Sequence, residues 1–104
     1  MAKQINRLPT HPGDVIREEL QTRRISQKEF SSRTGIHYTL FNEIVNCKRP
    51  VTIEIALIME ASLGLNPEML INMQTRYNIA KELLKPDIIS NLNHIRETCA
   101  SWLV

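Results

Sequence analysis

The sequence predicts an all-α fold, and three observations support this prediction. Apolar residues recur at helical spacing along most of the 104 residues, whereas the strict alternation typical of strands is scarce. Glycine occurs only three times, and prolines or capping residues stand where the apolar segments begin. With 42% hydrophobic residues, a chain of this length can form one small domain with a terminal extension.

The first helix is expected to begin near Pro12. Thr10 or His11 can cap its N-terminus, Pro12 suits a first helical turn, and the Asp14 carboxylate favours the positive end of the helix dipole. The buried side of this helix is expected to carry Val15, Ile16 and Leu20.

The second helix opens with "SQKE", from Ser26 to Glu29, which has the spacing of a capping box. Phe30 is expected to point inward, and the small Ser31 would allow a close crossing with another helix. This helix should end near Gly35, since glycine adopts the positive φ of a tight turn without strain.

The third helix is predicted from about His37 to Asn46. Its buried side would carry Phe41, Ile44 and Val45. Its opposite side would carry Tyr38, Thr39, Asn42 and Glu43.

A fourth helix follows Pro50 and should be capped by Thr52, with Gly64 at its end. Its inward residues are expected to be Ile55, Ile58, Met59 and Leu63. Asn66 and Pro67 predict the start of a fifth helix, which would run to about Leu84. Its apolar contacts are expected at Leu70, Met73, Tyr77, Ile79, Ala80 and Leu83.

Pro86 can start a sixth helix. An apolar stripe at helical spacing runs through it, with Trp102 beside it: Ile88, Leu92, Ile95, Cys99 and Leu103. Such a helix either covers its own domain or packs against another chain. The expected division is therefore a domain over 1–84 and a helical extension over 85–104.

Together, the short second helix, the glycine turn and the two-sided third helix predict a helix-turn-helix unit over about 26–46. In such a unit the third helix buries one side and lays its polar side in the major groove of DNA. The charge distribution agrees, because residues 1–52 hold nine Lys and Arg against five Asp and Glu, while residues 53–104 hold four against six. Plain solvated basic residues remain the alternative interpretation of that asymmetry.

Three segments carry a family resemblance. "ISQKEFSSRTGIHYTLFNEIVNCKRPVT" resembles the helix-turn-helix of the XRE (lambda-repressor-like) family. "LPTHPGDVIREEL" before it and "ASLGLNPEMLINMQTRYNIA" after it look like the HigA (VapI-like) branch, the antidotes of toxin–antitoxin pairs. The resemblance covers about residues 7 to 82, and it implies a lambda-repressor-like five-helix DNA-binding domain with an additional C-terminal helix. The last twenty residues resemble no family.

The resemblance also implies roles for individual residues. Gln27 stands where the family contacts a phosphate, and Lys48 and Arg49 match a basic pair that grips the DNA backbone. The base-contacting positions of the family fall on Tyr38, Thr39 and Glu43, with Asn42 as a further candidate. These residue types suit the task, because Asn pairs with adenine edges, Glu accepts from cytosine N4 and a Thr methyl touches a thymine methyl.

Each role has an alternative. Tyr38 could be an exposed aromatic residue without a ligand, Glu43 could pair with a neighbouring cation, and the basic pair could be plain solvated charges. Two residues also depart from the family pattern. Cys47 stands where the family has glycine, so we expect the helix end to differ or Asn46 to adopt the positive φ. Leu40 replaces a small or polar residue and would touch thymine methyls or help the domain to pack.

The resemblance implies a cytoplasmic antitoxin that dimerises, represses its own operon on a palindromic operator and neutralises a HigB-like mRNA-cleaving toxin. A regulator without a toxin and an interaction module that has lost DNA binding are the alternatives. The residues predict no enzyme, because paired carboxylates, a nucleophile–base arrangement and a phosphate-binding glycine loop are missing. No cofactor or metal is expected, since the three histidines are scattered and the two cysteines, 52 positions apart, are expected to be reduced. No membrane span is expected either.

Overall fold

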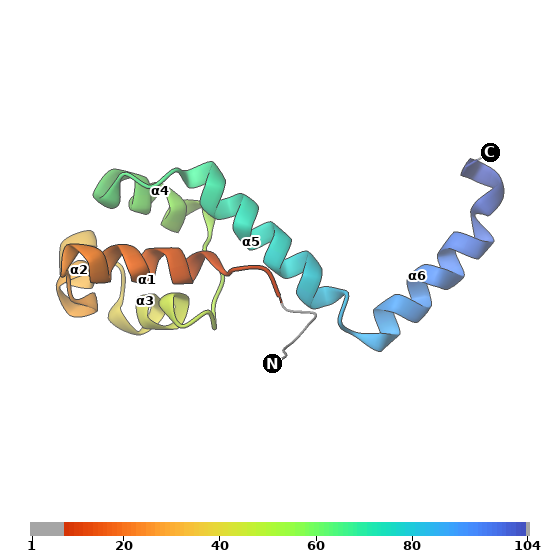
Figure 1. Ribbon diagram of the computed structural model, residues 1–104, viewed down its shortest axis with the longest axis horizontal. Coiled ribbons are helices and arrows are strands. Elements are labelled where there is room, and N and C mark those ends of the chain that lie inside the picture. Colours follow the sequence, from red (N-terminus) through yellow and green to blue (C-terminus); the bar gives the residue numbers. More distant parts are fainter. Residues whose placement is uncertain (1–7, 104) are drawn as a thin grey trace.

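A computed structural model describes residues 8–103, and within this range every regular element is helical (Figure 1). The elements are α1 (Pro12–Arg23), α2 (Gln27–Thr34), α3 (Tyr38–Val45), α4 (Ile53–Leu63), α5 (Pro67–Glu82), α6 (Pro86–Thr98) and the 3₁₀ turn η1 (Ala100–Leu103). The all-α prediction is confirmed, and each helix boundary that was predicted lies within a residue or two of its expected place.

The predicted caps explain why the helices begin where they do. Of the two candidates before α1, the structure selects His11, whose Nδ1 accepts a hydrogen bond from the Gly13 N–H at 2.8 Å. The expected N-terminal caps are also present: Ser26 for α2, Thr52 for α4 and Asn66 for α5. His37, where the third helix was expected to begin, caps α3. Two helices end at glycines with positive φ, 81° at Gly35 and 74° at Gly64.

The hydrophobic core lies among α1, α3, α4 and the first half of α5. Phe41, Ile16, Ile44, Met59 and Leu70 are fully enclosed there, and Val15, Ile25, Leu40, Ile58, Leu65 and Ile71 pack against its edge. The helix α2 joins this core through Phe30, whose ring stacks on that of Phe41 with centroids 4.9 Å apart. The most extensive contacts of α3 are therefore with α1 and α2.

At Gly13, α1 packs closely against the backbone of α3. A Cβ added at this position would overlap the backbone carbonyl oxygen of Ile44, far inside van der Waals contact. The side chain of His11 and the backbone of Ile44 enclose the remaining space. The absence of a side chain at Gly13 thus permits the α1–α3 crossing that holds α3 in place.

The second half of α5 and all of α6 lie outside this core. Figure 1 shows α5 continuing past the other helices and α6 turning away from it after a short connection. The apolar contacts that were expected at Ile79 and Leu83 of α5 are wrong. Both side chains are exposed, because this part of α5 lies beyond the core. No residue of α6 is buried, so α6 does not cover its own domain.

Within residues 8–103, no helix is both long and apolar enough to cross a membrane.

Candidate nucleic-acid interface

The turn between α2 and α3 sets the angle at which α3 leaves the domain. Gly35 closes α2 by donating from its N–H to the Ser31 carbonyl at 2.9 Å, and the Thr34 hydroxyl donates to the Phe30 carbonyl at 2.8 Å. Ile36 is buried directly after this turn. The His37 Nδ1 then accepts from the Thr39 N–H at 3.3 Å and starts α3. Each residue of the turn is therefore bonded or buried, which gives α3 a defined orientation.

A small residue lies in the interior of α2, as the sequence predicted. Ser31 is buried, and its hydroxyl has no hydrogen-bond partner among the described residues. A larger side chain at this position would have to displace the surrounding core, because buried sites in proteins are close-packed.

The side of α3 opposite the core carries the predicted polar residues. Tyr38 is about half exposed, at 47%, and Thr39 is exposed beside it. Asn42 and Glu43 follow one turn further along and are partly exposed. The buried residues of α3 are the expected Phe41, Ile44 and Val45. A helix with this division of surface can keep its core contacts while its polar side meets a ligand.

An amide chain links this polar side to the start of α2. The Asn42 Nδ2 donates to the Gln27 Oε1 at 2.9 Å, and the Asn46 Nδ2 donates to the Asn42 Oδ1 at 3.3 Å. Gln27 is the first residue of α2, so its backbone lies at the positive end of that helix. Asn42 is held from both sides, yet its amide retains one donor hydrogen and an acceptor lone pair for a base edge.

Basic residues follow the end of α3. The Arg49 Nε donates to the Glu43 Oε1 at 2.7 Å, so the anticipated pairing of Glu43 with a neighbouring cation is present in the unliganded chain. Among the described residues Lys48 makes no ion pair. Lys48 and Arg49 are both exposed, and together with Gln27 they flank the polar side of α3.

The end of α3 corrects the expectation for Cys47. The Lys48 N–H donates to the Glu43 carbonyl at 2.9 Å and the Cys47 N–H to the Ile44 carbonyl at 3.0 Å, which is the bond pattern of a Schellman motif. Cys47 itself adopts φ 63°, while Asn46 stays at φ −97°. The helix thus ends as it would with glycine, because its two C-terminal hydrogen bonds outweigh a strain of about 1–2 kcal/mol.

The Cys47 thiol has a partner in α1. Its Sγ lies 3.3 Å from the Asp14 Oδ1, and Asp14 also accepts from the Arg17 guanidinium at 2.8 Å. Burial, and then the hydrogen bond to Asp14, raises the pKa of the Cys47 thiol, so the group stays protonated and donates. Both Cys47 and Cys99 are free, and no cluster of His, Cys, Asp or Glu within residues 8–103 could hold a metal ion.

His11 has a larger structural role than the sequence indicated. It is buried, and its ring meets the Tyr77 ring edge-on with centroids 4.8 Å apart, which joins α1 to α5. Burial is the main cause that lowers the pKa of His11 below its ordinary value of 6.5, and its neutral Nδ1 accepts from the Gly13 N–H. Leu40 packs against the core, so packing is the role that the structure gives it.

No protein-family model matches the chain. Virulence-associated protein I of Dichelobacter nodosus is 32% identical over 76 residues, which span 71% of this chain and 70% of that protein. The chain belongs to the HigA-like (VapI-like) family of helix-turn-helix proteins. An addiction module antidote protein of the HigA family from Coxiella burnetii has a similar structure, with a TM-score of 0.68, 26% identity, and coverage of 88% of this chain and 95% of the other.

A further HigA-like structure shares the fold. The antitoxin HigA of Pseudomonas aeruginosa, solved with the higBA promoter, has a TM-score of 0.68 and 22% identity, and the match covers 86% of this chain and 92% of that one. The lambda-repressor-like, all-helical fold predicted for the chain is therefore confirmed. Within this HigA-like fold, Gln27, the polar side of α3 and the basic pair at 48–49 lie around one helix-turn-helix unit.

Proposed function

We propose that this HigA-like chain is the DNA-binding antitoxin of a toxin–antitoxin pair. In this proposal a homodimer represses its own operon by binding a palindromic operator, and it also binds and neutralises a HigB-like mRNA-cleaving toxin. The observation that carries the proposal is the polar, exposed side of α3, which is held by the core and flanked by Gln27 and the Lys48–Arg49 pair.

The two kinds of DNA contact would divide among these residues. Phosphate contacts position a protein on the duplex, and base-edge contacts determine which sequence is bound. Gln27, Lys48 and Arg49 lie at the ends of the helix-turn-helix unit, which suits backbone phosphates. Tyr38, Thr39 and Asn42 lie on the outward side of α3, which suits base edges in the major groove.

Glu43 and Arg49 form an ion pair in the unliganded chain, and the proposal gives this pair a role. A carboxylate next to DNA is repelled by phosphates unless it accepts from cytosine N4 or stays paired with a cation. The bond of 2.7 Å to Arg49 neutralises Glu43 while the chain approaches DNA. On a site with a suitably placed cytosine, Glu43 would turn to the base and Arg49 to a phosphate.

A dimer on a palindrome is part of the proposal, because two-fold symmetric proteins match half-sites about one helical turn apart. We also propose that residues 1–84 form the DNA-binding domain and residues 85–104 form a separate helical extension. The proposal further places the chain in the cytoplasm and gives it no catalytic activity. The relatives described above are named as antidotes, antitoxins or virulence-associated proteins, and none of these names denotes an enzyme.

The experiment combines a DNA-binding assay with a co-purification. The chain should retard DNA from its own promoter region more strongly than random DNA, and both affinities should fall steeply with salt. Co-expression with the neighbouring gene should yield a complex with a small basic nuclease-like protein. Specific retardation without such a neighbour would support a regulator without a toxin, whereas no retardation even at low salt would refute DNA binding.

A further inference from the structure

Gln74 is the buried amide side chain of α5, and the function proposed above does not use it. It is 6% exposed, and both ends of its amide are bonded. Its Oε1 accepts from the Val51 N–H at 2.8 Å, and its Nε2 donates to the Asn78 Oδ1 at 2.9 Å. A backbone N–H can only donate, so the bond to Val51 determines which way the Gln74 amide points. A buried side chain of α5 is thus bonded to the backbone of a distant segment.

That segment is the α3–α4 connection, residues 46–52, which carries Lys48 and the neighbouring arginine. Its beginning is held by α3, because the Lys48 N–H donates to a carbonyl of that helix at 2.9 Å. Pro50 has no N–H. Of the N–H groups at positions 49, 51 and 52, only that of Val51 has a hydrogen-bond partner in the part of the chain that the structure describes. Gln74 therefore supplies the directional anchor for the second half of the connection.

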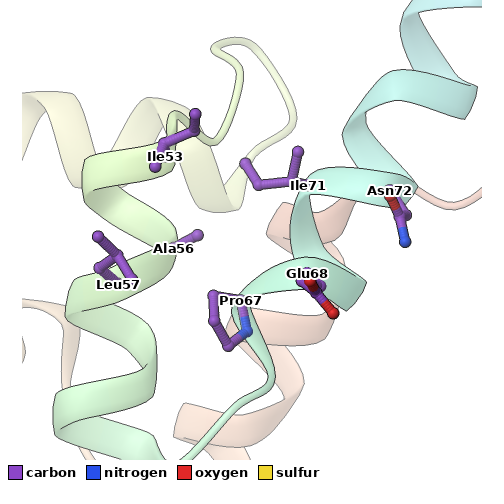
Figure 2. Close-up of a pocket in the computed structure, with 7 residues that line it drawn as sticks. All are labelled: Ile53, Ala56, Leu57, Pro67, Glu68, Ile71 and Asn72. Carbon is purple, nitrogen blue, oxygen red and sulfur yellow. The ribbon is translucent and has the colours of Figure 1, made fainter.

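The packing of α4 on α5 places Gln74 beside this connection. Ile53 at the start of α4 and Ile71 of α5 line the same shallow groove between the two helices (Figure 2). Gln74 follows Ile71 by three residues, so it lies one turn further along the same side of α5. Gln74, Lys48 and Arg49 in turn line one depression between α5 and the connection. The buried amide and the two cations are therefore neighbours in space, although they are distant in sequence.

We propose that Gln74 is a positioning residue for the phosphate contacts of the chain. By holding the Val51 N–H, it keeps the α3–α4 connection in the conformation in which Lys48 and Arg49 meet the DNA backbone. This inference rests on the proposed function and deepens it, since the basic pair has a phosphate to meet only if the chain binds DNA. It gives a role in DNA binding to a residue that makes no contact with DNA itself.

The physical reason is preorganisation. A buried N–H without a partner is costly, so without Gln74 the connection would move until the Val51 N–H reached water or another acceptor. The Val51 side chain is buried as well, but apolar contact is not directional and leaves the orientation of the backbone less defined. A connection that is already ordered loses less conformational entropy when Lys48 and Arg49 bind phosphate. Loss of the anchor should therefore weaken binding to every DNA sequence.

Hydrogen exchange of the full chain without DNA tests the anchor itself. Gln74→Met keeps the length of the side chain and removes the amide, so the Val51 N–H should exchange at least about tenfold faster relative to the Met59 N–H inside α4. Gln74→Asn, whose amide is one methylene too short for this bond, is a second variant with the same expected result. Gln74→Glu keeps an acceptor for Val51, and Asn78 can turn its own amide to donate, so this variant should retain the protection. Gly64→Ala, the matched control, introduces strain at a positive φ away from the connection and should leave the ratio of the two rates within about twofold.

A double-mutant cycle on DNA binding, at a temperature where every variant is folded, tests the positioning. Lys48→Ala should weaken binding to promoter and random DNA about tenfold in the wild-type background. In the Gln74→Met background the same change should cost less than about threefold, because the contact is already impaired. Thr39→Ala, on the polar side of α3, should have the same effect in both backgrounds within about twofold. A residue that merely stabilised the fold would not show a coupling restricted to the basic pair.

An unchanged exchange ratio at Val51 in Gln74→Met would overturn the anchor. Additive effects of Gln74→Met and Lys48→Ala, or an equal coupling to Thr39→Ala, would overturn the positioning role and leave the proposed function intact. A wild type that binds no DNA would refute the proposed function and the positioning role with it. The exchange rates would then still decide whether the anchor exists, so the two failures are distinguishable.

Discussion

Gly13→Ala tests whether the α1–α3 crossing positions α3 as described. In an unobstructed helix, alanine is more favourable than glycine by about 0.5–1 kcal/mol, so the substitution would stabilise the chain. Here the new methyl group would overlap the Ile44 carbonyl oxygen, and that carbonyl also accepts from the Cys47 N–H at the end of α3. Relief of the overlap requires α1 and α3 to separate.

Overpacking of this kind costs about 1–3 kcal/mol, or more where the contact is with backbone. We therefore expect a net loss of about 2 kcal/mol in the free energy of unfolding, which lowers Tm by about 8–16 °C for a domain of this size. Thermal and guanidinium unfolding, followed by circular dichroism, measure both quantities. Operator affinity should fall as well, because α3 shifts with its support.

Gly64→Ala is the matched control. A Cβ at Gly64 meets no atom within 4 Å, so only its positive φ of 74° is strained, at a cost of about 1–2 kcal/mol. This control should leave operator binding of the folded chain unchanged, since Gly64 lies away from α3. If Gly13→Ala proves as stable as the wild type, or more stable, the close crossing is not present in solution and the reasoning is refuted.

Cys47→Val should lower the free energy of unfolding by at least about 1 kcal/mol in guanidinium unfolding, because a β-branched side chain tolerates φ 63° poorly. Cys47→Gly should stay within about 1 kcal/mol of the wild type. Equal stabilities of the two variants would contradict the left-handed conformation at this position. Because burial lowers the pKa of His11 below 6.5, the unfolded chain binds the proton more readily, so the contribution of His11 to stability should be complete above pH 6.5 and decline as the pH falls below it. His11→Asn keeps a capping acceptor and should reduce this loss of stability at low pH. An unchanged dependence of stability on pH in this variant would refute the role given to His11. Lys48→Ala should weaken binding to operator and random DNA alike and reduce the slope of log K against log salt by about 0.9. Tyr38→Ala or Thr39→Ala should instead change which operator sequence is preferred. If Lys48→Ala weakens binding to the operator alone, the division between phosphate and base contacts is contradicted.

Local sequence signals were sufficient to predict where the helices begin and which side of α3 is buried. Capping residues such as Ser26 and Asn66 determine where helices begin through bonds to backbone N–H groups two or three residues away, so a short stretch of sequence contains the information. The two sides of α3 were predictable for the same reason, because helical spacing alone separates Phe41 and Ile44 from Tyr38 and Thr39.

Contacts between distant segments were not predictable in this way. The Asn42–Gln27 bond joins residues fifteen positions apart, and the Cys47–Asp14 contact joins residues thirty-three positions apart. The role of Gly13 depends on which backbone crosses it, a property of the packed fold. The conformation of Cys47 was predicted wrongly, because glycine preference was given more weight than the two hydrogen bonds that close α3.

For the apolar stripe of the last helix, the sequence predicted the helix but did not predict what the stripe contacts. Its spacing predicted an amphipathic helix, and α6 is present where expected. The spacing left open what the stripe meets, since that depends on how far the preceding helix carries it from the core. In the structure α5 extends past the core, so α6 lies away from the rest of its own chain (Figure 1).

We propose that the polar side of α3 gives this HigA-like chain its preference for one DNA sequence. The most direct test is a salt titration of binding to its own promoter and to random DNA of equal length, for the wild type and for Thr39→Ala with Tyr38→Ala. We expect the wild type to bind the promoter at least about a thousandfold more tightly than random DNA. The double variant should lose most of this ratio while retaining the salt dependence of its binding. An unchanged ratio in the double variant would contradict this proposal.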